Sequence, residues 1–318
     1  MRVCQQAMTL DQLRIFIAVA ERENMTRAAE AVHITQSAVS GAIAALEAAH
    51  DVHLFHRIGR RIELTDAGRM FLDEARGILA RVDSAQQALS DWTGLRRGRL
   101  VIAASQTIAA YWLPERLARF RRHYPDIDLD LAIANTGGTA RAVLAGDAEL
   151  GFVEGALDDP ALAQWPIGAD RMVLVGPPGT TARDLATSLP TTLGADPVTN
   201  TWLAQADWVM REPGSGTRSS FEAAMRDRGL DPDAFSVALT LPSNEAVLSA
   251  VRAGAGHAVL SRLVVAPAVQ SGAVCALACD LPARPFFAMR HKERYRGKAA
   301  EALLDVIASY EENVDWVI

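Results

Sequence analysis

A proline-free run at residues 70–95 constrains the fold of this 318-residue chain more than any other feature. Gly77 and Gly94 are its only glycines, and its apolar residues recur close to the helical period. These apolar residues are Phe71, Ile78, Val82, Leu89 and Trp92. The pattern predicts one helix from Asp66 to Leu95 between two differently patterned regions. Because such a connecting helix has little core of its own, we expect it to pair with its copy in a second chain.

The residues before this run have the pattern of three short helices. Thr9 and Gln12 fit a capping box, and Asn24 and Thr35 are suitable caps for the second and third helices. Two short helices joined by a tight turn, with a preceding helix that braces them, are typical of a helix-turn-helix. A plain bundle of three helices would give the same periodicity, so the helices alone leave both interpretations open.

Side chains suited to DNA lie at the start of the third helix and in the segment after it. Short polar residues there could reach phosphates or base edges, and residues 53–64 read as two strands around a Gly-Arg turn. Such a hairpin would lie along the phosphate backbone as a wing, although a solvated surface hairpin is the alternative. The candidate DNA contacts are Thr35, Gln36, Ser37, Ser40, Arg57, Arg60 and Arg61.

Composition and charge limit the remaining classes of protein. Hydrophobic residues make up 50% and charged residues 22%, which excludes a disordered or low-complexity chain. We expect a cytoplasmic protein, because no apolar run would span a membrane and no signal-peptide core is recognisable. The net charge is −6, but residues 1–98 hold 12 Arg against 12 Asp and Glu. A DNA-binding surface in this part must therefore be a local patch.

Strands and helices alternate after Gly98, in two successive runs. This order predicts an α/β fold with parallel, doubly wound sheets in two lobes. We expect lobe I at about residues 98–168 plus 268–318 and lobe II at about 169–267. Residues 171–176 and 273–278 are the candidate strands that cross between the lobes.

Small polar residues follow the predicted strands of both lobes. In open α/β sheets, ligands bind at the carboxyl ends of strands and near helix N-termini. Free N–H groups, hydroxyls and arginines there favour a small anion, although ordinary helix capping uses the same residue types. A carboxylate such as that of Glu154 would repel an anion unless it pairs with an arginine or the ligand brings a proton. The candidate effector-binding residues are Ser105, Gln106, Thr107, Asn135, Thr136, Thr139, Glu154, Ser215, Gly216, Thr217, Arg218, Ser243 and Asn244.

Catalytic and metal-binding motifs are missing from the sequence. The glycine-rich segment 214–218 lacks the lysine of a phosphate loop, and neither a nucleophile elbow nor a zinc-protease motif occurs. We therefore expect no enzymatic activity, no cofactor and no metal. A solute-binding protein or an α/β enzyme using the same cleft is the alternative. A solute-binding protein would not explain residues 8–66, and an enzyme would need a nucleophile or metal constellation that the sequence lacks.

Four motifs resemble the LysR-type transcriptional regulators: residues 35–40 (TQSAVS), 46–47 (LE), 54–57 (LFHR) and 64–68 (LTDAG). The resemblance implies a winged helix-turn-helix at 8–66, a linker and dimerisation helix at 67–97, and a two-lobed effector-binding domain like periplasmic binding proteins at 98–318. It implies homodimers that pair into homotetramers on promoter DNA, with RNA polymerase as a further partner. Asp51 departs from the family pattern, since a glycine usually ends the recognition helix, and we expect it to be left-handed.

The effector part resembles one branch of that family, the regulators of sulfur assimilation, sulfite response and carbon fixation. The similar segments are 104–108 (ASQTI), 151–155 (GFVEG), 211–218 (REPGSGTR) and 243–246 (SNEA). The resemblance implies a small anionic effector: sulfite, another sulfur oxyanion, or a small phosphorylated or carboxylate metabolite. Binding of this effector between the lobes would shift promoter binding.

Overall fold

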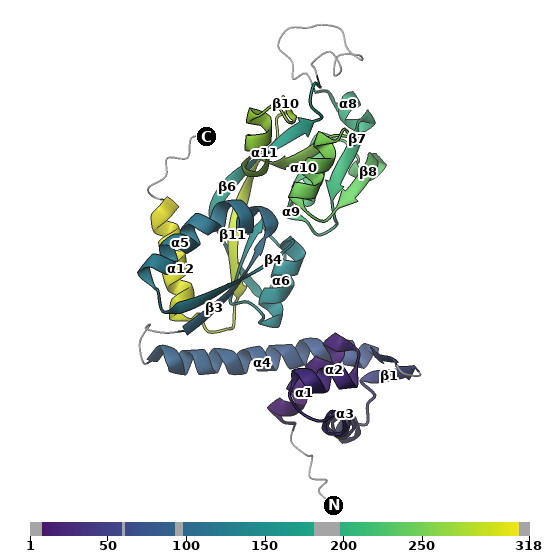
Figure 1. The fold of residues 1–318 in the computed structure, drawn as a ribbon, viewed down its shortest axis with the longest axis vertical. Helices are drawn as coiled ribbons and strands as arrows, with labels where there is room; N and C mark the ends of the chain where they lie inside the picture. Colours follow the sequence, from purple (N-terminus) through teal and green to yellow (C-terminus); the bar gives the residue numbers. More distant parts are fainter. Residues whose placement is uncertain (1–7, 59–60, 93–97, 181–197, 312–318) are drawn as a thin grey trace, which may run out of the picture. The chain divides into compact units, whose positions relative to one another are not determined.

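The computed structural model describes residues 8–58, 61–92, 98–180 and 198–311. The chain forms two compact units (Figure 1). The first comprises residues 1–94 together with 144–147, and the second comprises the remainder of the chain.

The first unit has the predicted winged helix-turn-helix and linker helix. Its elements are α1 (Leu10–Arg22), α2 (Met25–Ala31), α3 (Gln36–His50), β1 (Phe55–Ile58), β2 (Arg61–Leu64) and α4 (Asp66–Trp92). Thr9 and Gln12 form the expected capping box, and the side chains of Asn24 and Thr35 cap α2 and α3. These caps satisfy N–H groups that the first helical turn leaves without partners.

One aromatic cluster holds this unit together. Phe16 of α1 is fully buried, and its ring centroid lies 5.4 Å from that of Phe55 and 4.8 Å from that of Phe71. The cluster therefore joins the helices, the hairpin of β1 and β2, and the start of α4 in one core. The end of the linker helix expected at 93–95 lies outside the described residues.

Two long antiparallel strands run through the second unit: β6 (Leu162–Gly176) and β11 (Ala283–His291). We call them the hinge strands. In lobe I, β11 pairs with β5 (Leu150–Glu154). Strand β5 pairs in parallel with β3 (Gly98–Ser105), and β3 pairs in parallel with the edge strand β4 (Ile127–Ala134). The helical segments of this lobe are η1 (Ile108–Trp112), α5 (Leu113–His123), α6 (Thr136–Ala145) and α12 (Lys298–Glu311).

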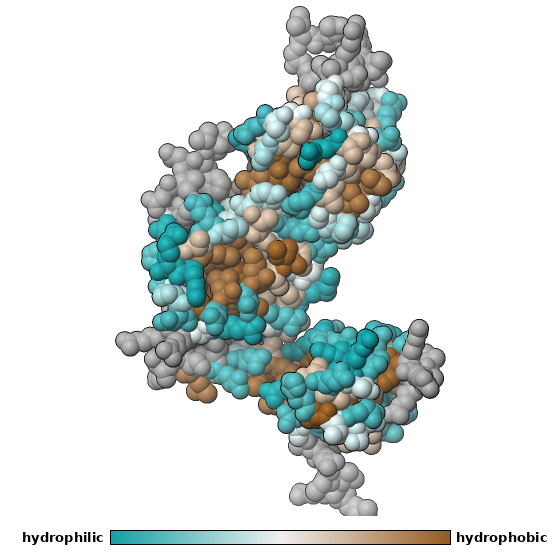
Figure 2. All heavy atoms as spheres, viewed as in Figure 1, coloured by the Kyte–Doolittle hydropathy of each residue, from teal (hydrophilic) through white to brown (hydrophobic). Residues whose placement is uncertain are grey.

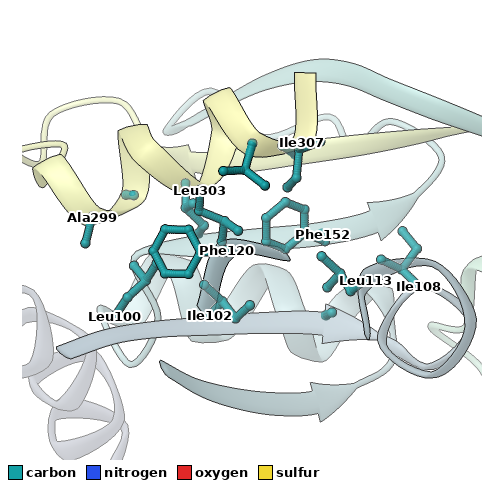
Figure 3. Close-up of a cluster of buried hydrophobic side chains, with 14 of the residues drawn as sticks. Leu100, Ile102, Ile108, Leu113, Phe120, Phe152, Ala299, Leu303 and Ile307 are labelled. Carbon is teal, nitrogen blue, oxygen red and sulfur yellow. The ribbon is translucent and has the colours of Figure 1, made fainter. Parts of the chain in front are cut away.

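Helices α5 and α12 pack together against the sheet of lobe I. Figure 3 shows Leu303 and Ile307 of α12 directed toward Phe120 and Phe152, which come from α5 and β5. All four side chains are almost completely buried. This core fixes the carboxyl ends of β3, β4 and β5, where the predicted effector residues lie.

Lobe II contains β7 (Asp207–Arg211) and β8 (Ser236–Leu241) as a parallel pair. Strands β9 (Ala258–Ser261) and β10 (Cys275–Leu277) pair with the second half of β6. The helical segments are α8 (Asn200–Gln205), α9 (Gly216–Asp227), η2 (Pro232–Ala234), α10 (Asn244–Arg252) and α11 (Arg262–Gln270). Trp208 is fully buried at the centre, with Phe221 at 4.6 Å and Phe235 at 5.9 Å between ring centroids.

The second crossing strand differs from the one expected at 273–278. That segment forms β10, whose Leu277 packs in the core of lobe II, and the crossing strand is β11. Lobe II therefore extends past residue 268, and the chain returns to lobe I along β11. Pro285 makes this strand hard to predict from the sequence, because proline has no N–H to donate to a neighbouring strand. It pairs with Ala169 close to a shift in the register of the two hinge strands.

Candidate effector site and DNA-binding surface

The residues that follow β3 bring the two lobes into direct contact. Gln106 Nε2 donates to the carbonyl of Pro242 at 2.8 Å, and its Oε1 accepts the backbone N–H of Asn244 at 3.2 Å. Asn244 Nδ2 in turn donates to Thr107 Oγ1 at 3.1 Å. The structure thus places Gln106 and Thr107 of lobe I against Asn244 of lobe II. We call this region, with the other candidate effector residues around it, the interlobe site.

Two hydroxyl groups in lobe I are buried without a partner among the described residues: Ser105 Oγ and Thr139 Oγ1. Ser105 ends β3, while Thr139 lies in the first turn of α6, directly after the neighbouring strand β4. Their exposed fractions are 2% and 0%. A buried polar group without a hydrogen bond lowers stability, so such a pair calls for an explanation.

Arg211 at the end of β7 is the centre of a polar network that links the lobes. Its Nε and Nη2 donate to both carboxylate oxygens of Glu212 at 2.8 and 3.0 Å, and its Nη1 donates to Asn244 Oδ1 at 2.5 Å. Asn135 Nδ2 reaches across from lobe I to Glu212 Oε1 at 3.1 Å. Burial raises the pKa of Glu212, but the hydrogen bonds from Arg211 and Asn135 outweigh it and bring the pKa below its usual value.

Glu154 lies buried at the end of β5, with few donors around it. Thr136 Oγ1 donates to its Oε2 at 3.3 Å, and Arg284 Nη1 lies 3.9 Å from its Oε1. The main partners of Arg284 are Asp170 Oδ2 at 2.7 Å and Thr217 Oγ1 at 3.1 Å. We call Glu154, Asp170 and Arg284 the hinge cluster. It contains two carboxylates and one guanidinium, so its acidic groups outnumber its basic group.

Gly216 allows helix α9 to begin directly against Glu154. A Cβ atom on this glycine would lie 2.6 Å from Thr136 Oγ1 and 3.0 Å from Glu154 Oε2, so any side chain would force these groups apart. Ser215, just before α9, is buried and makes no side-chain cap. The N-terminus of α9, with its partial positive charge, therefore faces the carboxylate of Glu154.

Ser243 and Arg218 have partners within lobe II that need no ligand. Ser243 caps α10 by accepting the N–H of Ala246 at 3.0 Å. Arg218 Nε donates to Glu222 at 2.7 Å, and its Nη1 donates to the carbonyl of Arg211. Sequence reasoning omitted Arg211, Glu212 and Arg284 from the candidates. The motif at 211–218 contains Arg211 and Glu212 and could have identified them. Arg284 could not be found in this way, because it lies on β11, which Pro285 makes hard to predict as a strand.

The recognition helix α3 presents a small, polar face at its start. Gln36 and Ser37 are exposed and Ser40 is half-buried, while Thr35 Oγ1 accepts the N–H of Ala38 at 3.2 Å. Asp51 ends the helix in the left-handed conformation at φ 50°, as expected.

Of the candidate arginines in the hairpin, Arg57 lies on β1 and Arg61 on β2, and the structure describes the backbone of each but not its side chain. Arg60 lies outside the described residues. Among the described residues, no helix has the length and apolar character needed to cross a bilayer, and no group of three acidic, His or Cys residues is arranged to hold a metal.

Two family descriptions match the chain: "Bacterial regulatory helix-turn-helix protein, lysR family" at residues 10–69 and "LysR substrate binding domain" at 93–311. A probable RuBisCO transcriptional regulator of Nostoc sp. is 31% identical over 313 residues, which are 97% of this chain and 90% of the relative. The HTH-type transcriptional regulator CysL of Bacillus subtilis is 33% identical over 258 residues, 81% of this chain and 82% of CysL.

Solved structures show the same fold at lower identity. Full-length CbnR complexed with its target DNA has a TM-score of 0.64 at 22% identity, covering 95% of this chain and 99% of CbnR. The Synechocystis CcmR regulatory domain in complex with 2-PG has a TM-score of 0.58 at 23% identity, covering 69% of this chain and 99% of that domain. From both family matches and these relatives, the chain belongs to the LysR family and is a ligand-responsive, DNA-binding transcriptional regulator rather than an enzyme.

Proposed function

We propose that a small anion binds at the interlobe site and that its binding shifts the affinity of this regulator for promoter DNA. The observation that carries the proposal is the pair of buried hydroxyls without partners, Ser105 Oγ and Thr139 Oγ1. Ser105 lies at the carboxyl end of β3 and Thr139 in the first turn of α6, where the helix dipole favours negative charge. An oxyanion would accept hydrogen bonds from the hydroxyls and from the first turn of α9, because the N–H groups of Gly137 and Gly138 in α6 already donate to Gly214 and Asn135.

The charged groups around the site limit which classes of anion can bind there. Arg211 is neutralised by Glu212, and Arg284 is shared between Asp170 and Glu154. A fully ionised anion next to Glu154 would be repelled. An anion that keeps a proton or carries a hydroxyl would instead donate a hydrogen bond to this carboxylate. We therefore propose sulfite as hydrogen sulfite, a hydrogen phosphate ester, or a small hydroxylated carboxylate as the effector class.

One structural neighbour supports a small-molecule effector in this domain. The CcmR regulatory domain was solved in complex with 2-PG. We further propose that the chain acts in the cytoplasm as a homodimer or homotetramer on promoter DNA, with RNA polymerase as a further partner. The candidate DNA contacts are those of α3 and of the hairpin that follows it.

The effector proposal is tested by calorimetry on the full chain with sulfite, sulfate, thiosulfate, phosphate and 2-PG. Ser105→Ala and Thr139→Val each remove one hydroxyl that has no partner among the residues that the structure describes, so folding should be unaffected. Each should weaken binding of the tightest of these anions by roughly ten- to hundredfold, the effect of losing about 1.5–3 kcal/mol.

A matched control removes a hydroxyl elsewhere in the second unit. Ser271 Oγ donates to the carbonyl of Ala268 on the exposed end of α11, so Ser271→Ala should leave anion affinity unchanged. Full retention of affinity in both Ser105→Ala and Thr139→Val would place the effector outside the interlobe site. Weaker binding in Glu154→Gln would support donation from the anion to Glu154, and stronger binding would contradict it.

A further inference from the structure

The face of the recognition helix α3 that points away from the core carries no long side chain. Val39, Ile43 and Leu46 of this helix are buried in the core of the first unit. On the opposite side, three or four positions apart, lie the exposed residues Ser37, Gly41, Ala44 and Ala48. The second helix of a helix-turn-helix lies in the major groove of DNA. The surface that α3 offers to base edges therefore consists of one hydroxyl group, alanine methyl groups and exposed backbone.

Gly41 lies within this outer face, and no contact inside the chain accounts for it. A glycine inside a helix lowers stability relative to alanine. A Cβ atom at Gly41 would have no neighbour within 4 Å apart from the helix's own turns, so the free protein has room for alanine. A glycine also lets a ligand approach the backbone closely. DNA is the ligand of this unit, since residues 10–69 match the helix-turn-helix of the LysR family.

Beyond its first turn, α3 has few means of forming hydrogen bonds with bases. Between residues 41 and 49, every exposed residue is a glycine or an alanine. Glu47, which is half-buried, accepts the backbone N–H groups of Leu54 and Phe55 and is thus directed toward the hairpin. The helix contains neither lysine nor arginine. Apolar contact is the interaction that remains, and in the major groove the apolar group of a base is the C5-methyl group of thymine.

We propose that α3 recognises thymine by its methyl group: Gly41 and Ala44 contact thymine methyl groups, whereas Gln36 and Ser37 form hydrogen bonds with bases. The inference deepens the proposed DNA contacts of α3 and rests on them. Among the four bases, thymine alone presents a methyl group in the major groove, so this contact distinguishes it from the other three. Burial of one methyl group corresponds to roughly fourfold in affinity.

The test begins with binding sites selected by the full chain from a pool of random duplex DNA. Each thymine of a selected site is then replaced singly by deoxyuridine, which lacks only the methyl group, and affinity is measured by fluorescence anisotropy. At thymines that α3 contacts, affinity should fall about fourfold. At the same positions, a 5-methylcytosine·guanine pair should bind about fourfold more tightly than a cytosine·guanine pair. Unchanged affinity at every thymine would overturn the proposal.

Variants then assign the methyl contacts to α3. Gly41→Ala should stabilise the folded chain but weaken binding to the thymine site, because its methyl group would occupy the space of the thymine methyl group. Deoxyuridine at the contacted position should restore binding to this variant. Ala44→Gly should lose the preference for thymine over deoxyuridine at its own position. Ala49→Gly makes the same change in the last turn of α3 and should keep every preference. An undiminished deoxyuridine penalty in both Gly41→Ala and Ala44→Gly would contradict the assignment.

Gln36→Ala separates methyl recognition from the proposed DNA contacts of α3. If this variant changes sequence preference while deoxyuridine and 5-methylcytosine have no effect, α3 contacts bases and only the methyl recognition fails. If neither the variant nor the modified bases change preference, the proposed contact of α3 with base edges fails as well. Selection that enriches no preferred site would also count against both.

Discussion

At the scale of single residues, two side chains of the first unit show what the family motifs do physically. Glu47 Oε1 accepts the backbone N–H groups of Leu54 at 2.7 Å and Phe55 at 3.3 Å, so it ties the start of the hairpin to α3. Gly68 lies where α4 passes the same backbone: a Cβ there would lie 2.1 Å from the carbonyl oxygen of Leu54. These two motif positions therefore have packing roles that position the DNA-binding elements.

We predict that Gly68→Ala destabilises the first unit, because the added carbon must displace the backbone at Leu54. The expected loss in the free energy of unfolding is about 1–3 kcal/mol. Urea unfolding of the full chain, followed by circular dichroism, measures it. Gly77→Ala on the same helix is the matched control: no atom lies within 4 Å of its Cβ position, so it should stabilise the helix by about 0.5–1 kcal/mol. Similar destabilisation by both variants would contradict this account.

At the scale of elements, local signals were sufficient to predict most of the helices and parallel strands. Caps such as Thr9 and Asn24 fix helix starts through neighbours in sequence, and the alternation of strands and helices after Gly98 predicts parallel strands such as β3 and β4. The hinge strand β11 could not be predicted in this way because its pairing with β5 and β6 is long-range and Pro285 opposes a strand locally. Arg284, and with it the hinge cluster, was missed for the same reason.

The same limit applies to the interlobe site. The sequence placed polar residues after each strand, and the structure brings Gln106, Thr107 and Asn244 together. The sequence alone could not show that Ser243 caps a helix or that Arg218 pairs with Glu222, because helix capping, ion pairing and ligand binding use the same residue types. Only the three-dimensional structure distinguishes a hydroxyl that has a hydrogen-bond partner from one that lacks it.

Helix α4 leaves apolar residues exposed in the single chain, as Figure 2 shows along this helix. The exposed fractions are 66% for Met70, 41% for Ile78 and 75% for Leu89.

We predict that these residues form an apolar interface, or seam, with α4 of a second chain. Ile78→Asp combined with Val82→Asp should disrupt this seam, because unpaired charge would be buried there. Light scattering should show smaller particles. Asp83→Lys alters charge on another side of α4 and should leave the assembly intact; an unchanged mass in the double variant would refute the seam.

The recognition helix and the hairpin should contribute differently to DNA binding. Arg57→Ala or Arg61→Ala should weaken binding to all sequences and flatten the slope of log affinity against log salt by about one unit, because a phosphate contact is lost. Gln36→Ala should instead change the preference among sequences, as expected for a side chain that reaches base edges. Fluorescence anisotropy with DNA from upstream of the gene, at several salt concentrations, measures both. Arginine variants that alter preference without altering the salt slope would reverse these assignments.

At the scale of the whole molecule, regulation requires that effector binding and DNA binding favour the same arrangement of the chain. The direct links between the lobes supply an element that an effector can bias. Besides the contacts of Gln106 with Asn244 and of Asn135 with Glu212, Tyr111 Oη donates to Glu245 Oε1 at 3.2 Å. Burial, and then the charge and hydrogen bond of Glu245, raise the pKa of Tyr111, so this link stays protonated at neutral pH. An anion that enters between the lobes must rearrange some of these links, and that difference in contacts is what shifts a population.

Our last prediction follows from thermodynamic linkage between the two sites. If the tightest-binding anion changes DNA affinity by some factor, DNA must change anion affinity by the same factor. A factor of about 5–150, in either direction, is typical of such coupling. Anisotropy with and without saturating anion gives the first factor, and calorimetry with and without DNA gives the second. Combining Ser105→Ala with Thr139→Val should abolish the anion's effect on DNA at the same anion concentration while leaving DNA affinity without anion unchanged. A DNA response that persists in this variant, or two factors that differ beyond error, would show that the anion acts through a site other than the interlobe site.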